Sequence, residues 1–175
     1  MNFVRAKMTL TDKILNKLDK LGRKRIIMDR ESNEPYLERY YLFLKDRPSW
    51  FPFNIFLHKF LKSDPDVPHD HPWGYATLIL KGGYYEWIPK INSLGEKFGE
   101  YRMWRGPGHF RICSPNSYHR IELHPDVTAW TLFMPGIHKR EWGFLTGSLW
   151  TTKWVHHEQF LKDRREQANT RSNPV

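Results

Sequence analysis

The stretch HDHPWGYATLILKGG, residues 69–83, begins with two histidines one residue apart and continues as an apolar run that ends at a glycine pair. In an extended strand alternate side chains leave on the same face, so His69 and His71 point together while Asp70 points away. Imidazole binds zinc, iron, nickel and copper alike. The pair therefore indicates a metal site without choosing the metal.

A third histidine lies on a later segment, PNSYHRIEL at residues 115–123. There His119 shares a strand face with Ile121 and Leu123, and the charged residues between them take the other face. His119 is therefore expected on an inward, largely apolar side. Each histidine could instead be an ordinary residue satisfied by hydrogen bonds, but a doublet and a distant third on matching strands favour one shared metal ion.

Length and composition narrow the class of protein. A chain of 175 residues can bury a sizeable core, so a metal would serve function and not merely folding. The single cysteine, Cys113, excludes an intramolecular disulfide and suits a reducing compartment. The first residues lack the apolar run of a signal peptide, and no stretch approaches the roughly 20 apolar residues of a membrane span. We expect a cytoplasmic protein with no membrane partner.

The net charge of +9 raises the question of a nucleic-acid partner. Basic residues gather at 13–30 and 162–165, where acidic residues are mixed among them. A solvated surface is the favoured interpretation, and nucleic-acid binding remains the alternative.

Short apolar runs separated by turn residues predict an all-β protein from residue 25 onward. The runs follow one another closely without helices between them, which is typical of an antiparallel sandwich or barrel, and a jelly roll is the leading form. Exposed edge strands at 25–44 could pair between two subunits, giving a homodimer. The predicted strands are 25–28, 36–44, 54–61, 68–71, 75–80, 84–88, 100–105, 109–113, 118–123, 127–134 and 139–144.

Two helices are expected outside the strands. Residues 11–21 place apolar residues at helical spacing, with Thr11 and Asp12 able to cap the start and Gly22 to end the helix. The strand pattern stops after Trp150, and residues 154–167 predict a C-terminal helix. The expected organisation is one domain with three parts: a helical segment packed on the barrel (1–24), the β-barrel (25–150), and a C-terminal helix with a frayed tail (151–175).

These motifs resemble those of the cupin superfamily, whose small double-stranded β-helix barrels hold a metal through two motifs. The first, with His-x-His, is represented by His69-Asp70-His71-Pro72 running to Gly82. The second, with Pro and His, is represented by Gly106-Pro107-Gly108 and then by the segment that ends at His119. The resemblance covers about residues 52–135, and residues 57–86 look like an uncharacterised cupin-like subgroup of bacteria and their viruses. It implies an all-β jelly-roll barrel with a divalent metal held by His69, His71 and His119.

One cupin ligand is missing from its usual place. Cupins usually add a glutamate a few residues after the histidine pair, and the matching position here is Tyr75 or Ala76. A three-His site resembles the facial sites of thiol dioxygenases in the same superfamily, which use Fe(II). The resemblance thus implies Fe(II), with Zn, Ni or Mn as alternatives, and a metal-dependent oxygenase or isomerase acting on a small molecule. The alternative is a non-catalytic cupin module that binds a small ligand or a macromolecular partner.

Glu86 could supply the missing carboxylate, and the preceding turn decides whether it does. A three-residue hairpin loop at 81–83 turns Glu86 inward, whereas a two-residue turn at 82–83 pairs it with Ile79 and turns it outward. Inward, Glu86 would either bind the metal directly or support a ligand from behind. Outward, it would be a surface carboxylate and the site would have three histidines only.

His58 is the second candidate catalytic residue beside Glu86. It shares a strand face with Phe56 and Phe60, and either face of that strand could be the barrel interior. Inside, His58 could be an extra ligand, a proton carrier or a substrate contact. Arg111 could clamp an anionic group, but on an outward face it would be a solvated charge.

Overall fold

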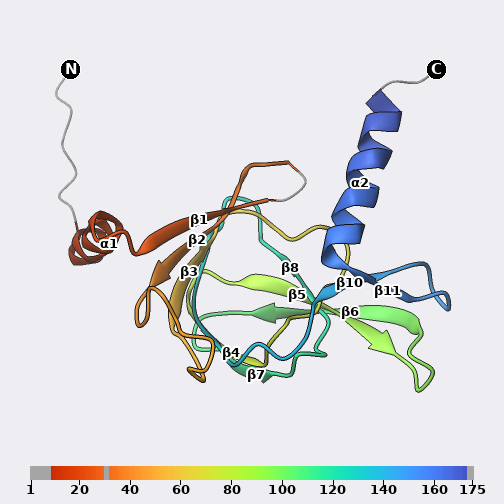
Figure 1. The fold of residues 1–175 in the computed structure, drawn as a ribbon, viewed down its shortest axis with the longest axis horizontal. Helices are drawn as coiled ribbons and strands as arrows, with labels where there is room; N and C mark the ends of the chain where they lie inside the picture. Colours follow the sequence, from red (N-terminus) through yellow and green to blue (C-terminus); the bar gives the residue numbers. More distant parts are fainter. Residues whose placement is uncertain (1–8, 30–31, 173–175) are drawn as a thin grey trace.

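The computed structural model describes residues 9–29 and 32–172, which contain two helices and eleven strands (Figure 1). In chain order these are α1 (Leu10–Lys20), β1 (Lys24–Met28), β2 (Pro35–Tyr41), β3 (Phe56–Phe60), β4 (Tyr75–Lys81), β5 (Tyr84–Ile91), β6 (Lys97–Arg105), β7 (Phe110–Cys113), β8 (Arg120–Glu122), β9 (Ala129–Pro135), β10 (Gly143–Thr146), β11 (Lys153–His156) and α2 (His157–Ser172). Six strands form a large sheet in the order β1-β2-β3-β9-β4-β7, three form a smaller sheet in the order β6-β5-β8, and β10 pairs with β11. All these pairings are antiparallel.

The hydrophobic core lies between the large sheet and the three-stranded sheet. Along β3 and β4 buried residues alternate with more exposed ones, as expected of strands with one face toward a core. Both sheets contribute to the buried cluster, which contains Leu37, Phe60, Ile79, Ala129, Tyr84 and Ile121. This arrangement confirms the prediction of an antiparallel jelly-roll barrel.

The chain changes sheets at the glycine pair, and this corrects the hairpin expected there. β4 pairs with β7 and β9, whereas β5 pairs with β6 and β8, so the turn forms a hairpin in neither of the two expected registers. Gly82 and Gly83 have φ of 73° and 143°, and a Cβ at Gly82 would lie 2.2 Å from the Thr128 carbonyl oxygen. The glycines let the backbone pass close to a neighbouring segment as it crosses between sheets.

The N-terminal helix α1 starts at Leu10 and is capped by Thr9, not by Thr11. The Thr9 hydroxyl accepts the Asp12 backbone N–H at 3.1 Å, and the Asp12 carboxylate accepts the Thr9 backbone N–H at 2.9 Å, forming a capping box. The helix buries none of its residues, and Leu10 and Ile14 are 74% and 52% exposed. Part of its apolar face therefore lies in solvent, at the end of β1 (Figure 1).

The C-terminal region contains a strand that was not predicted. β11 pairs with β10, and α2 begins only at His157, so the strand pattern extends past residue 150. Four residues are too few for their apolar pattern to distinguish a strand from the first turn of a helix, and only the folded chain supplies β10 as a partner. Beyond β11, α2 projects away from the barrel (Figure 1). Neither described helix is both long enough and apolar enough to cross a lipid bilayer.

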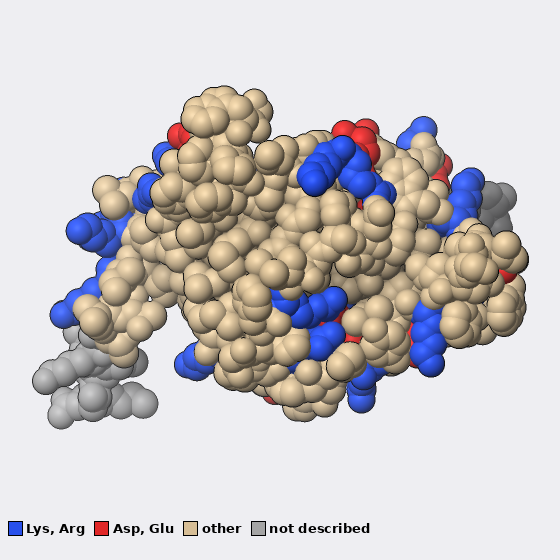
Figure 2. Space-filling view, turned by 90° about the horizontal axis from the view of Figure 1, so that it is seen from below, with Lys and Arg blue, Asp and Glu red and all other residues tan. Residues whose placement is uncertain are grey.

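Charged side chains are dispersed over the face shown in Figure 2. Lysines and arginines lie at many separate points on this face, and several have an aspartate or glutamate beside them. This distribution fits a solvated surface. Nucleic-acid binding stays a prediction, as does the homodimer, for which β1 would be the edge strand of the large sheet.

Candidate metal centre

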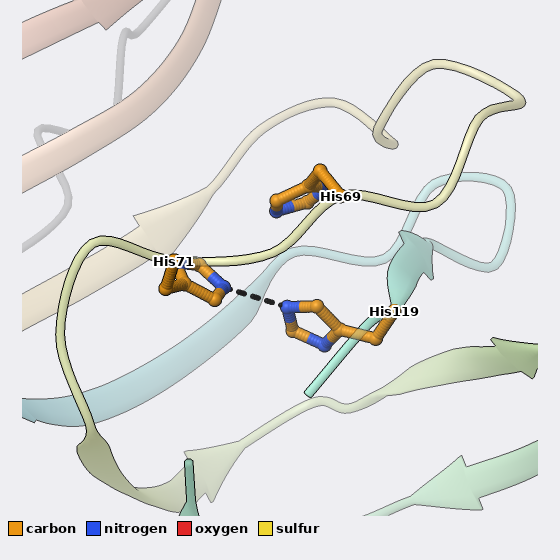
Figure 3. A group of neighbouring side chains, drawn as sticks. All are labelled: His69, His71 and His119. Carbon is orange, nitrogen blue, oxygen red and sulfur yellow. Dashed lines mark hydrogen bonds between the residues drawn. The ribbon is translucent and has the colours of Figure 1, made fainter. Parts of the chain in front are cut away.

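The three predicted histidines come together inside the barrel. His69 and His119 are antiparallel bridge partners, joined by backbone hydrogen bonds of 2.9 and 3.0 Å. His71 follows two residues later, and its Nε2 lies 2.9 Å from Nε2 of His119 (Figure 3). One donor atom from each ring lies within 4.8 Å of the other two. The alternation of the His-x-His segment and the pairing with the His119 strand thus direct the three rings to one point.

Asp70, between the two histidines, points away from them and anchors the segment. Its carboxylate is fully buried and accepts hydrogen bonds from the Gly143 backbone N–H at 2.7 Å, Arg140 Nη2 at 2.6 Å and Trp154 Nε1 at 3.1 Å. These donors belong to β10, β11 and the segment before β10. The β10–β11 hairpin therefore fixes the backbone that presents His69 and His71.

Glu86 points inward and lies behind His119. Its Oε1 accepts from Nδ1 of His119 at 2.8 Å, and its Oε2 accepts from Arg105 Nε at 2.8 Å and from Arg111. Because Glu86 sits on β5 and pairs with Ile121 of β8, it is the diagonal neighbour of His119 across the sheet. The cluster of mutually close donor atoms contains the three histidines, and Glu86 is not part of it. Its carboxylate is placed to orient His119.

The charge state of these groups follows from their surroundings. Burial works against ionisation of Glu86, but the hydrogen bond and charge of His119, with Arg111 and Arg105, bring its pKa down to about 2. Burial, with the neighbouring His69 and His119, lowers the pKa of His71 well below 6.5. An ionised Glu86 can only accept, so Nδ1 of His119 carries a hydrogen and Nε2 is the ring nitrogen that faces the cluster. A metal ion binds the ring nitrogen that carries no hydrogen, and in His119 the hydrogen bond to Glu86 leaves Nε2 for that role.

Tyr75 occupies the region where cupins usually place their glutamate. Its ring packs against His71 with centroids 4.7 Å apart, and its hydroxyl lies 3.4 Å from Nε2 of His119. Ala76, the other matching position, is on the opposite face of β4. A phenol at this position can form a hydrogen bond to a group bound beside the histidines.

A cavity of about 380 Å³ extends in front of the three histidines, and its wall includes Glu86 and Tyr75. His58 lies in the same wall, because Phe56, His58 and Phe60 form the buried face of β3. Its Nε2 accepts from Arg39 Nε at 2.9 Å, and burial together with Arg39 lowers its pKa well below 6.5.

Three arginines also line the cavity: Arg25, Arg39 and Arg111. Arg111 does not take the outward position in which it would be a solvated charge, because β7 turns its side chain toward the carboxylate of Glu86. Arg25 and Arg39 were not predicted from the sequence as residues of the cavity wall. The available signal was their spacing, since Arg25 alternates with Ile27 and Arg39 with Leu37, as residues of one inward face do.

A second cluster of metal-binding side chain types lies near the start of α2. Glu141, His156 and His157 also have donor atoms within 4.8 Å of one another, and His156 Nε2 is 3.4 Å from the Glu141 carboxylate. Glu141 is exposed and the histidines are partly exposed. This cluster lies outside the predicted site and could compete for added metal.

Comparison with known proteins gives the fold. No family model matches the sequence, and no curated protein matches it. Among solved structures, the polyketide cyclase RemF from Streptomyces resistomycificus matches with a TM-score of 0.52 and 17% identity, over 73% of this chain and 83% of that one. A protein of unknown function with a cupin-like fold from Ralstonia eutropha matches with a TM-score of 0.47 and 12% identity, over 100% of this chain and 93% of that one. Hydroxypropylphosphonic acid epoxidase from S. wedmorenis matches with a TM-score of 0.45 and 14% identity, over 65% of this chain and 56% of that one.

The fold is an all-β, cupin-like jelly roll with a helix at each end, and its interior contains a three-histidine cluster that could hold a metal ion. The narrower resemblance to a bacterial and viral subgroup stays a prediction.

Proposed function

We propose that this protein is a metal-dependent enzyme in which His69, His71 and His119 bind one divalent ion and the adjoining cavity takes a small organic substrate. The observation that carries the proposal is the convergence of three histidine donor atoms, within 4.8 Å of one another, on the wall of a cavity of about 380 Å³. A cavity of that size suits a small molecule.

Fe(II) is the first ion to test. Three imidazoles suit iron, zinc and nickel, whereas manganese prefers oxygen ligands and fits this set less well. Bound here, a divalent ion would act as a Lewis acid toward a substrate oxygen, and ferrous iron would also support oxygenase chemistry.

The two candidate catalytic residues have different roles in this proposal. Glu86, with a pKa of about 2 and three donors on its carboxylate, stays ionised and positions His119. His58 is neutral near pH 7 and lies in the cavity wall, and because its Nε2 accepts from Arg39, its Nδ1–H is the group that can donate a hydrogen bond to a substrate. The Tyr75 hydroxyl can donate a hydrogen bond to a bound substrate, and the apolar walls restrict water.

Metal analysis of untagged protein from metal-supplemented cells tests the proposal. We expect about one equivalent of ion in the wild type and loss of that ion in His71→Ala and in His119→Ala. The double variant His156→Ala with His157→Ala is the control, because it removes the second cluster and should keep the ion. Metal-free wild-type protein, or an ion lost only in the control, would overturn the proposal.

An open coordination position separates an enzyme from a binding module. Nitric oxide added without oxygen to ferrous protein should give the electron paramagnetic resonance signal of an iron–nitrosyl complex. If the ferrous protein gives no such signal, the iron has no open position for a reactant, and the non-catalytic alternative is favoured.

A further inference from the structure

Polar side chains form a row across the inner face of the large sheet. Arg25 on β1 pairs with Arg39 on β2, Arg39 with His58 on β3, and His58 with Thr131 on β9. All four line the cavity that contains the histidine cluster. Arg25 is exposed, Arg39 is partly buried, and His58 and Thr131 are buried. The row therefore runs from solvent into the cavity.

The cations on the outer face of the same strands lie beside a carboxylate. Lys24 lies 2.9 Å and Lys59 lies 3.8 Å from the carboxylate of Glu38. Inside the cavity, Arg111 is paired with Glu86 in the same way. Each of these cations thus has a carboxylate partner, although Glu38 serves two lysines and Glu86 serves two arginines.

Arg25 and Arg39 differ from these cations. Within residues 9–29 and 32–172, neither forms an ion pair with a carboxylate. Like charges directly opposite each other on neighbouring strands are destabilising. Arg39 uses its Nε on His58, and its guanidinium carbon lies 4.6 Å from the Phe56 ring centroid, which holds the group in a fixed orientation. Two adjacent guanidinium groups at a cavity wall, one of them held by its neighbours, form a site for an anion.

We infer that Arg25 and Arg39 bind the anionic end of the substrate, which is a small organic molecule with a carboxylate or phosphonate on an apolar body. The inference rests on the proposed function, because it assigns the substrate class of the same cavity. The walls beyond the arginines are largely apolar and aromatic and include Ile27, Phe60 and Phe133. The anionic group would lie at the arginine end of the row and the apolar body would reach toward the histidines.

Binding of three related probes tests the substrate class. The probes are 3-phenylpropanoate, 2-phenylethylphosphonate and the neutral 3-phenylpropanamide, titrated by calorimetry against metal-loaded and metal-free protein. We expect at least one anion to bind and the amide to bind at least about tenfold more weakly, because it lacks the charge-assisted hydrogen bonds. The stronger anion identifies the acid group. Equal binding of the amide, or binding of no anion, would overturn the inference.

Variants locate the site of binding. Arg39→Gln should weaken anion binding about tenfold or more, and Arg39→Lys should retain part of it. Lys59→Gln is the matched control, since it removes one positive charge from the outer face next to His58 and should change binding less than about twofold. If Arg39→Gln does not fold, the affinity of the Arg25→Gln variant for the anionic probe replaces this test. Because Arg25 is exposed, we expect the affinity to fall only about threefold. Equal losses in Lys59→Gln and in the arginine variants would contradict a specific site.

The metal content separates this inference from the proposed function. Arg39→Gln should keep the metal stoichiometry of the wild type. If the protein binds anions through Arg39 but holds no metal, the proposed function fails and the anion site stands. If the histidines bind metal but no anion binds, the anion site fails alone.

Discussion

Replacing Glu86 with glutamine tests how the proposed metal site is held together. The carboxylate is 2% exposed and accepts from His119, Arg105 and Arg111. Glutamine keeps the shape but has no charge. Its single oxygen can still accept from His119, which turns the NH₂ group toward the arginine N–H donors. The substitution therefore places donors against donors in a buried position.

The lowered pKa of Glu86 indicates how much stability the substitution should remove. The difference between its ordinary value of 4.5 and the value of about 2 in the folded protein corresponds to about 3 kcal/mol. Because the folded-state pKa is the lower one, this stability is fully present above pH 4.5 and is lost as the pH falls toward 2. Breaking a buried ion pair costs a similar amount, about 3–5 kcal/mol.

Urea unfolding of metal-free protein at neutral pH measures this effect. We expect Glu86→Gln to lower the free energy of unfolding by about 3 kcal/mol, and to weaken metal binding about 10- to 100-fold, because the partner that orients His119 is lost. Glu122→Gln is the control, since Glu122 lies on neighbouring β8 and is more exposed, and its loss should cost less than about 1 kcal/mol. Equal stability of the two variants would refute the role given to the Glu86 carboxylate.

Two further predictions concern His58 and the sheet crossing. His58 has a lower pKa in the folded than in the unfolded protein, so metal-free wild type should lose stability as the pH falls below 6.5, with His58 contributing up to about 1.4 kcal/mol per pH unit. Urea titrations at several pH values give the number of protons taken up on unfolding, and in His58→Gln this number should be smaller by about one. An unchanged number would argue against a neutral buried imidazole at position 58. Gly82→Ala should lower the free energy of unfolding by more than about 2 kcal/mol, because φ is 73° and the new Cβ would meet the Thr128 oxygen at 2.2 Å. Gly95→Ala is the control, because Gly95 has φ of 82° but open space around it. Thermal melting should show a smaller drop in melting temperature for Gly95→Ala than for Gly82→Ala.

The sequence determined the features that depend on neighbours in the chain. Alternation alone placed His69 and His71 on one side of Asp70, and placed His119 and Ile121 on an inward face. The turn residues and short apolar runs determined an all-β fold. The helical spacing of Ile14, Leu15 and Leu18 gave α1 to within one residue, although its cap is Thr9.

The tertiary structure decided which strands meet. Glu86 faces His119 because β5 pairs with β8 across a change of sheet, not because of the turn at 82–83 from which its direction was argued. The inward face of β3, and with it the position of His58, also depended on which sheets enclose the cavity.

The pairing of Arg25 with Arg39, and the strand β11, became visible only once the strand partners were known. The physical reason is the same in each case. Period-two alternation fixes which residues share a face, but the choice of pairing partner depends on contacts between distant segments. His69-Asp70-His71 therefore predicted the ligand direction, and only the folded barrel supplied the carboxylate behind His119 and the arginines across the cavity.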